Sequence, residues 1–309
     1  MKLAFVFPGQ GSQSVGMGQD LWNASEEVKG IYDEASNVLG YDVAALSFNG
    51  PKEELDKTFR TQPCILTASI AAYTALTKAG ITPDCVAGHS LGEYSAVVAA
   101  GALPFGEVVR IVETRGRLMQ EAVPEGQGMM AAILGMDSQK ISALCQTIVG
   151  TVSPANYNCP GQVVIAGETE AVKAAMAKAI EQGAKKAVPI AMSVPSHCRL
   201  MEPACQGLAE IFQTLTFANP SVCFVNNADA KLVKTGEAVR DGLIRQLNHP
   251  LLWEDSIAAL VSMGVDTFVE VGPGNVLSGL IKRISKGKTL LNVEDTQSLN
   301  KTIEHLQRR

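Results

Sequence analysis

Short apolar stretches that alternate with amphipathic helical patterns constrain the fold of this chain more than any other feature. Residues 3–7 are apolar throughout and stop at a glycine-rich turn, which is typical of a parallel strand buried on both faces. Similar strands are predicted at residues 85–88, 267–271 and 289–293, and helices at 26–39, 63–78, 91–100, 105–123, 203–215, 237–247 and 276–286. This alternation predicts an α/β protein with a mostly parallel sheet, in which Pro63 occupies the first turn of its helix.

One segment in the middle of the chain breaks this pattern. After a turn at residues 124–128 the predicted order is β-α-β-β-α-β, with strands at 129–134, 152–156, 162–166 and 187–192 and helices at 138–148 and 170–182. This order is typical of a ferredoxin-like unit, which forms a complete small domain. A chain of 309 residues is long enough for about two domains. We therefore expect residues 1–126 and 196–309 to form a large α/β domain, and residues 127–195 to form a small domain inserted into it.

Composition and charge exclude several classes of protein. The chain is 46% hydrophobic and 18% charged, as ordinary globular proteins are, and its net charge of −5 gives no electrostatic reason to bind nucleic acid. Its seven cysteines are odd in number and contain no C-x-x-C pair, which argues against a disulfide framework and a zinc ribbon. The apolar run at residues 3–7 is too short for the core of a signal peptide, and no later segment has the roughly 18 uninterrupted apolar residues of a membrane span. We expect a cytoplasmic protein without a membrane segment or a metal.

The sequence Gly88-His89-Ser90-Leu91-Gly92 is a G-x-S-x-G motif between a predicted strand and a predicted helix. In this context the motif predicts a nucleophile elbow, in which the glycines allow a sharp turn and Ser90 is presented at a helix N-terminus. A tight turn that only packs a helix against the sheet remains the alternative. Cys159 and Cys198 are rival nucleophiles, but neither lies in an elbow, and we expect both to be small buried residues.

A serine nucleophile needs a base, and the chain has four histidines. His89 adjoins Ser90, where neighbouring side chains should diverge, while His249 precedes a proline and His305 lies in what we expect to be a polar C-terminal tail. His197 stands just past a predicted strand end, where the catalytic residues of α/β proteins collect. We expect His197 to be the base, and a surface histidine without a role is the alternative.

Arg115 is the exception on an otherwise amphipathic helix. At 100° per residue it falls in the middle of the apolar arc of helix 105–123, whereas the other charged residues of that helix lie on other faces. A buried guanidinium is costly unless it meets a carboxylate. That carboxylate could belong to an internal salt bridge or to a substrate held in the two-pronged geometry of arginine.

The glycine-rich turn at residues 9–16 is a second candidate for binding. It does not match a dinucleotide-binding fingerprint, because position 14 is Ser and no acidic residue closes a second strand. Backbone amides of this turn could instead face Ser90 and supply half of an oxyanion hole, with the amide of Leu91 as the other half.

These motifs follow one another along essentially the whole chain. They are Phe7 to Gln13, Thr61-Gln62-Pro63, Gly88 to Glu93, Arg115, Asn156 to Gly161, Ser196-His197 and Glu270 to Gly274. In combination they resemble the malonyl-CoA:acyl carrier protein transacylases of bacterial fatty-acid synthesis. The resemblance implies an α/β-hydrolase-like large domain with a ferredoxin-like small domain.

The resemblance also implies a role for each matching residue. Ser90 would be the acylated nucleophile, His197 its base and Arg115 the residue that holds the malonyl carboxylate, with Gln62 as a further pocket residue. The amides of Gln10 and Leu91 would form the oxyanion hole. The family has no acidic third member, and Gln246 resembles the residue that orients the histidine through a carbonyl. Gln246 lies in the last turn of a predicted helix, where backbone carbonyls lack intrahelical partners.

The function implied is ping-pong transfer of malonyl from malonyl-CoA to the phosphopantetheine thiol of acyl carrier protein, for fatty-acid elongation, without a metal or redox cofactor. The carrier protein is acidic, so we expect a basic docking patch on a monomeric enzyme, with Lys282, Arg283, Lys286 and Lys288 as candidates and a merely solvated helix end as the alternative. Two other functions remain as alternatives: a serine thioesterase or hydrolase, which uses the same nucleophile and base, and a non-catalytic subunit that docks the carrier protein.

Overall fold

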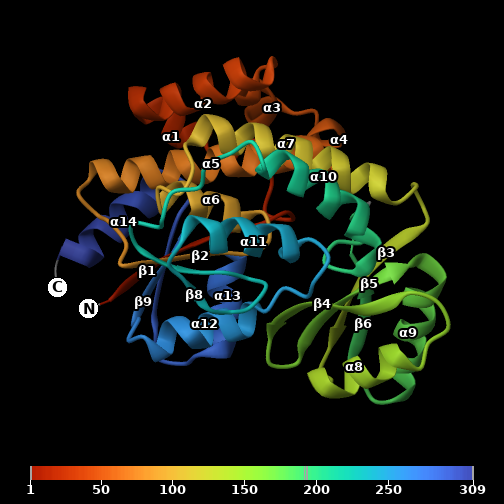
Figure 1. Ribbon diagram of the computed structural model, residues 1–309. Helices are drawn as coiled ribbons and strands as arrows, with labels where there is room; N and C mark the ends of the chain where they lie inside the picture. The colour runs from red at the N-terminus through yellow and green to blue at the C-terminus, as the bar shows by residue number, and fades with distance from the viewer. Residues whose placement is uncertain (1, 191, 193, 308–309) are drawn as a thin grey trace.

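The computed structural model describes residues 2–190, 192 and 194–307, which form two β-sheets with helices packed around them (Figure 1). Sheet A has the order β10-β9-β1-β2-β7-β8, and its strands are parallel except β8, which runs antiparallel to β7. Sheet B has the order β4-β5-β3-β6 and its pairs are antiparallel. The bounds are β1 (Leu3–Phe7), β2 (Cys85–Gly88), β7 (Cys223–Val225), β8 (Leu232–Val233), β9 (Thr267–Val271) and β10 (Thr289–Val293) in sheet A, and β3 (Gly128–Leu134), β4 (Val152–Cys159), β5 (Gln162–Glu168) and β6 (Lys186–Pro189) in sheet B.

Helices cover both faces of sheet A, with α5, α6 and α7 on one side and α12 and α13 on the other (Figure 1). Phe5 and Phe7 of β1 pack into the larger hydrophobic cluster, while Ala4 and Val6 pack into the cluster that contains α12 and α13. Because successive side chains of a strand point to opposite faces, this double burial explains why the run is apolar throughout. The helices of this part are α1 (Gln19–Ala24), α2 (Glu26–Leu39), α3 (Val43–Asn49), α4 (Lys52–Leu55), α5 (Thr58–Lys78), α6 (Gly92–Ala99), α7 (Phe105–Ala122), α10 (Glu202–Phe212), α11 (Gly236–Gln246), α12 (Trp253–Ser262), α13 (Val276–Ile284) and α14 (Thr296–Gln307).

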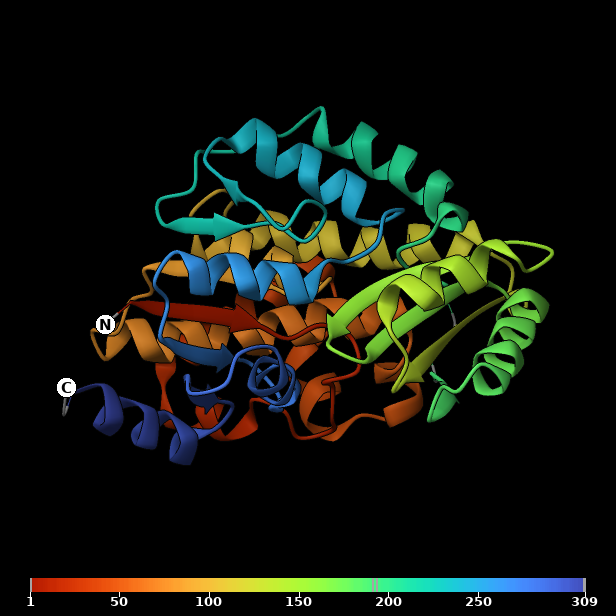
Figure 2. The same ribbon diagram turned by 90° about the horizontal axis from the view of Figure 1, so that it is seen from below.

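Sheet B lies beyond the carboxyl end of β1, together with α8 (Ser138–Gln146) and α9 (Thr169–Glu181) (Figure 2). Its elements follow the predicted order β-α-β-β-α-β. A side chain at Gly128 would lie 2.5 Å from the ring of Pro195, so the segment leaves and rejoins the rest of the chain at one place. The second link is Leu251, whose carbonyl accepts from the amide of Tyr157 (2.9 Å) and whose amide donates to the carbonyl of Ala155 (2.8 Å). These links hold sheet B against the carboxyl edge of sheet A.

Several local predictions were wrong. Helix α5 begins at Thr58, so Pro63 lies inside the helix and not in its first turn; its missing N–H leaves only one carbonyl without a donor. His305 lies on the amphipathic helix α14 and not in a polar tail. The strand predicted at 187–192 ends at Pro189, and residue 191 lies outside the described residues. Helices α1, α3, α4 and α12 and strands β7 and β8 were not predicted at all.

No helix in the described part of the chain is both long enough and apolar enough to cross a bilayer.

Candidate active site

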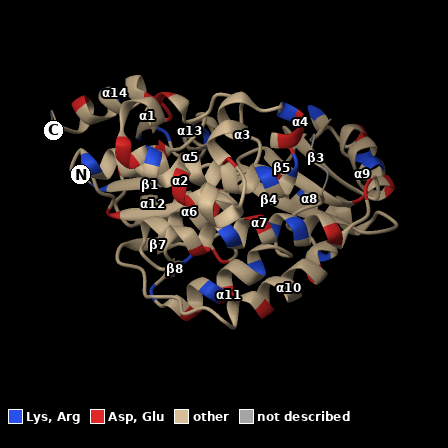
Figure 3. Ribbon diagram, turned by 90° about the horizontal axis from the view of Figure 1, so that it is seen from above, with Lys and Arg blue, Asp and Glu red and all other residues tan. Residues whose placement is uncertain are grey.

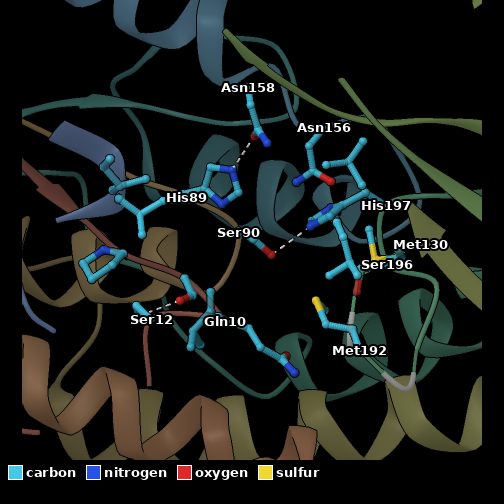
Figure 4. A pocket seen from close by; sticks show the side chains of 18 of the residues that line it. Gln10, Ser12, His89, Ser90, Met130, Asn156, Asn158, Met192, Ser196 and His197 are labelled. Atoms are coloured by element: carbon cyan, nitrogen blue, oxygen red, sulfur yellow. Dashed lines mark hydrogen bonds between the residues drawn. The ribbon is translucent and has the colours of Figure 1, made fainter. Parts of the chain in front are cut away.

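A cavity of about 210 Å³ lies between the two sheets, where β1 and β2 end (Figure 4). Ligand sites of open α/β sheets lie outside these carboxyl ends of the strands. Its lining comes from the turn after β1, from the turn after β2, from sheet B and from α13. The sequence-predicted residues Gln10, Ser90, Leu91, Arg115 and His197 all line this one cavity.

Ser90 occupies a sharp turn that only this pattern of glycines permits. Its backbone has φ of 53°, a left-handed conformation that is strained for a non-glycine residue. A side chain at Gly88 would lie 1.9 Å from the carbonyl carbon of Gly92, and one at Gly92 would lie 2.0 Å from the carbonyl oxygen of Phe7. The turn is held from outside by Asn227, which accepts from the amide of Ser90 (2.8 Å) and donates to the carbonyl of Gly88 (2.7 Å). The geometry is that of a nucleophile elbow.

His197 connects the hydroxyl of Ser90 to the end of α11. Its Nε2 lies 2.8 Å from Ser90 Oγ (Figure 4), and its Nδ1 lies 2.7 Å from the backbone oxygen of Gln246. Gln246 is the last residue of α11, so its carbonyl has no intrahelical partner and accepts the Nδ1 proton. That bond leaves Nε2 as the acceptor of the serine proton.

Burial keeps the imidazole of His197 neutral. The residue is 2% exposed, and burial lowers the pKa of His197 to about 3, against the opposing effect of its bond to Gln246 and with help from the charge of Arg115. A neutral imidazole next to a serine hydroxyl can act as a general base.

Arg115 is buried on α7, with 1% exposure, and is held by amide oxygens. Its Nη1 donates to Gln62 Oε1 (2.7 Å), and its Nη2 donates to Gln246 Oε1 (3.1 Å) and to Ser90 Oγ (3.3 Å). Its Nε has no hydrogen-bond partner, and no carboxylate forms a salt bridge with it in the described part of the chain. Among the described residues, the internal salt bridge that the sequence left open is therefore absent, and the guanidinium lies beside the candidate nucleophile without a carboxylate in contact with it.

Two residues that line the cavity have backbone amides without an acceptor in the described part of the chain. Among the described residues, the N–H groups of Gln10 and Leu91 make no hydrogen bond to another protein group. Leu91 precedes the first turn of α6, where amides lack intrahelical partners. Gln10 is brought close because Gly9 has no side chain; a Cβ there would lie 2.3 Å from the carbonyl oxygen of His89. The two amides are suited to hold an oxyanion.

Other residues of the cavity were not predicted individually. Glu93 and Asn227 lie behind the elbow, while Asn156 and Asn158 line the cavity from β4. His89 turns away from Ser90, and its Nε2 lies 2.9 Å from Asn158 Oδ1 (Figure 4). Its ring packs edge-on against Trp253. Glu93, Asn156 and Asn158 lie within motifs quoted above, but Asn227 follows a strand of three residues and no sequence signal marks it.

The candidate basic residues lie outside the cavity, at and after the end of α13. Arg283 donates to Gln162 Oε1 (2.7 Å) and to the carbonyl of Pro160 (3.2 Å), and Lys288 donates to the carbonyl of Val265 (3.1 Å). Lys282 and Lys286 are exposed. The rival nucleophiles Cys159 and Cys198 are each 1% exposed, and neither lies in an elbow.

Comparisons with known proteins agree with this geometry. Residues 4–304 match the family model of the acyl transferase domain. The chain is 49% identical over 306 residues to the malonyl CoA-acyl carrier protein transacylase of Escherichia coli, covering 98% of this chain and 99% of that protein, and 43% identical over 308 residues to that of Bacillus subtilis, covering 99% and 97%.

Solved structures give the same result. A malonyl-transacylase in complex with a type II polyketide acyl-carrier protein superposes with a TM-score of 0.97 at 48% identity, covering 99% of this chain and 100% of that one. An acyl carrier protein S-malonyltransferase of Vibrio cholerae superposes with a TM-score of 0.95 at 46% identity, covering 98% and 100%. The chain therefore belongs to the acyl transferase family, and within it to the malonyl-CoA:acyl carrier protein transacylases.

Proposed function

We propose that this acyltransferase moves a malonyl group from malonyl-CoA to the phosphopantetheine thiol of an acyl carrier protein, through a malonyl ester of Ser90. The observation that carries the proposal is the position of Arg115, whose guanidinium lies 3.3 Å from Ser90 Oγ inside the cavity. An acyl group attached to Ser90 and ending in a carboxylate would meet this cation, whereas a neutral acyl group would leave it unpaired. The names of the relatives support the same substrate.

The first half-reaction forms the acyl-enzyme. His197 Nε2 takes the proton of Ser90 as Oγ attacks the thioester carbonyl, and the amides of Gln10 and Leu91 stabilise the oxyanion. The C–S bond then breaks, and the CoA sulfur leaves with the proton from His197. Gln246 holds the imidazole in position in both its neutral and its protonated state, because its backbone oxygen accepts the Nδ1 proton in each.

The second half-reaction reverses these steps with a different thiol. His197 removes the proton of the phosphopantetheine thiol, the sulfur attacks the ester carbonyl, and the same two amides stabilise the oxyanion. The C–O bond breaks and Ser90 recovers its proton from His197. Each step uses only side chains and backbone groups of this chain, without a cofactor.

For the carrier protein we propose docking at the end of α13, with Lys282, Arg283 and Lys286 as the basic residues. This helix begins with Val276 and Leu277 at the cavity and ends at the lysines, so a carrier bound there would lie next to the cavity. Arg283 also bridges to β5 through Gln162, which limits its freedom. Charges of both signs are interspersed over the helices, so a local patch rather than the whole field must attract an acidic partner (Figure 3).

We also propose that residues 1–126 and 196–309 form an α/β-hydrolase-like catalytic domain and residues 127–195 a ferredoxin-like insertion. The strand order of sheet B and the contact between Gly128 and Pro195 at the two ends of the segment support this division. The cavity would then lie between the two domains.

Mass spectrometry of the acyl-enzyme tests the function. The protein is mixed with malonyl-CoA or acetyl-CoA and the adduct is mapped, with Ser90→Ala as the control. We expect a malonyl adduct on Ser90 that disappears when holo carrier protein is added and appears there instead. Transfer without an adduct on Ser90 would contradict the mechanism, and release of malonate at the rate of transfer would indicate a hydrolase.

A further inference from the structure

Glu93 is a wholly buried carboxylate that the proposed reaction does not use. It lies in the first turn of α6, directly behind the Ser90 elbow, and is 0% exposed. Its Oε2 accepts from Gln246 Nε2 (2.7 Å) and from the amide of Asn227 (3.2 Å), while its Oε1 has no hydrogen-bond partner in the described part of the chain. A buried carboxylate without a contacting cation is costly, so its presence here needs a physical reason.

Gln246 links this carboxylate to Arg115. The side-chain oxygen of Gln246 accepts from Arg115 Nη2 (3.1 Å), and its side-chain nitrogen donates to Glu93 Oε2 (2.7 Å) and to the carbonyl of Ser90 (3.0 Å). A cation on one side and an anion on the other orient the amide in one way only. The backbone oxygen of the same residue accepts from His197 Nδ1, so a fixed side chain also fixes the carbonyl that orients the imidazole.

We propose that Glu93 has two roles in acyl transfer. It is a positioning residue, which anchors Gln246 and thereby His197. It is also the internal counter-charge of Arg115, so that an incoming malonyl carboxylate competes with it for the attraction of the guanidinium. The inference rests on the proposed function, since it concerns the binding of a carboxylate beside Ser90. It predicts two separable effects of Glu93, one through its hydrogen bonds and one through its charge.

The charge effect depends on the groups that surround Glu93. Arg115 faces it from α7, Tyr94 adjoins it on α6, and Arg245 of α11 and Asp229 lie beyond Gln246 and Asn227. Arg245 and Asp229 form a two-pronged ion pair, with N–O distances of 2.7 and 2.6 Å, and largely neutralise each other. Arg115 is therefore the charged group whose electrostatic interaction with Glu93 is not cancelled by another charge.

The effect of the Glu93 charge on malonyl binding should depend on whether Glu93 is protonated. Burial raises the pKa of Glu93 to about 7, although its bonds from Gln246 and Asn227 and the charge of Arg115 act against the shift. At pH 8 the carboxylate is charged and competes with malonyl for Arg115. At pH 6 it is protonated and the competition is removed, while His197 stays neutral at both values because its pKa lies near 3.

Two substitutions separate the two effects. Glu93→Gln keeps the shape and one oxygen acceptor but removes the charge, whereas Glu93→Ala removes both. The matched control is Glu270→Gln, which changes another 0% exposed glutamate in the same way; Glu270 accepts from the amides of Leu277 (2.9 Å) and Ser278 (2.7 Å) at the start of α13. The measurement is the time course of Ser90 acylation by mass spectrometry, with malonyl-CoA and acetyl-CoA varied at pH 6 and pH 8.

For Glu93→Gln at pH 8 we expect the half-saturating malonyl-CoA concentration to fall by roughly threefold or more, since one competing charge is gone. The value for acetyl-CoA should not change, and at pH 6 the variant and the parent should converge. For Glu93→Ala we expect the maximal acylation rate to fall by about tenfold or more with both donors, because the imidazole loses its support. Glu270→Gln should keep the parent's pH trend and donor ratio even if its melting temperature falls.

The opposite results are equally distinct. A Glu93→Gln variant that binds malonyl-CoA no tighter at pH 8, or that keeps the parent's pH trend, would overturn the counter-charge role. A Glu93→Ala variant with the parent's maximal rate would overturn the positioning role. If that variant does not fold, Glu93→Met, which fills the same space without an oxygen acceptor, takes its place with the same expected and opposing results. A parent enzyme that forms no malonyl ester of Ser90 contradicts the proposed function and this inference together, whereas a normal parent with unaffected variants contradicts only the inference.

Discussion

The substitution Gln62→Glu tests whether the charge of Arg115 is kept available for a substrate. Gln62 is 0% exposed, and its Oε1 accepts from Arg115 Nη1 at 2.7 Å. Glutamate has nearly the same shape, so the variant would place a carboxylate against a guanidinium that now touches only neutral groups of the protein. The variant therefore supplies the internal salt bridge that the native structure lacks.

The size of the effect follows from this geometry. Two unit charges about 4 Å apart attract each other by about 4 kcal/mol at an effective dielectric constant of 20. The malonyl carboxylate would have to compete with that attraction, while the new carboxyl group recovers part of its own desolvation cost. We therefore expect kcat/KM for malonyl-CoA to fall by about 10- to 1,000-fold, with about 1.4 kcal/mol for each factor of ten.

Donor specificity separates this effect from general damage. Acylation of Ser90 is measured with malonyl-CoA and acetyl-CoA at pH 8, and kcat/KM for acetyl-CoA should not fall, because the new salt bridge pairs the cation that would otherwise oppose a neutral acyl group. Arg115→Ala should lower the ratio of malonyl to acetyl transfer to a similar extent, because it removes the cation instead of pairing it. Acetyl-CoA should then be accepted better, since no unpaired cation opposes a neutral acyl group. Gln139→Glu, which adds the same charge on the exposed face of α8, serves as the control. An unchanged ratio of malonyl to acetyl transfer in Gln62→Glu would refute the reasoning.

Three further predictions concern folding, pH and docking. Gly88→Ala should reduce the free energy of unfolding by about 3 kcal/mol or more, because its Cβ would lie 1.9 Å from the backbone of Gly92. Gly30→Ala, in helix α2 with open space around it, should raise the free energy of unfolding by about 0.5 to 1 kcal/mol. Urea denaturation measures both changes. Folding lowers the pKa of His197 to about 3, so between pH 6.5 and pH 3 the unfolded state binds more protons than the folded state. The free energy of unfolding should therefore fall as the pH falls through this range. A His197→Gln variant should show a shallower decline of the urea midpoint with pH. Lys282→Glu should raise KM for carrier protein several-fold and leave KM for malonyl-CoA unchanged. Lys140→Glu, which makes the same change on the exposed face of α8, is the control. Equal effects of the two substitutions on KM for carrier protein would exclude docking at α13.

The sequence predicted those parts of the fold whose signal is local. The apolar run at β1 and the order of elements in sheet B follow from periodicities of two and of 3.6 residues, which act over a few neighbours. Strand β7, with three residues, is too short to show a period, and its place in sheet A depends on pairing with β2. Pro63 was misplaced because the interior position of a proline in a buried helix depends on packing, which can outweigh the loss of one hydrogen bond.

The site divides in the same way. Ser90 could be predicted from its strand-turn-helix context, and Arg115 from its position as the charged exception on an apolar arc. Asn227 could not, because its role arises only from contacts across 137 residues with Ser90 and 139 residues with Gly88. For Gln246, the position at a helix end predicted an available backbone carbonyl. The hydrogen bonds of its side chain to Arg115 and Glu93 could not be predicted, because they join residues that are far apart in the sequence.

The structure also explains why amides rather than carboxylates hold Arg115. A buried cation needs polar partners, and the oxygens of Gln62 and Gln246 provide them at 2.7 and 3.1 Å without cancelling its charge. The nearest buried anion, Glu93, lies one amide further away, so it offsets part of the cost of burying the cation without occupying its donors. One Nη2 hydrogen bond reaches Ser90 Oγ, and Nε has no protein partner. A guanidinium held in this manner is fixed in place and still able to bind the carboxylate of a substrate, which is the property that selection of a malonyl group over a neutral acyl group requires.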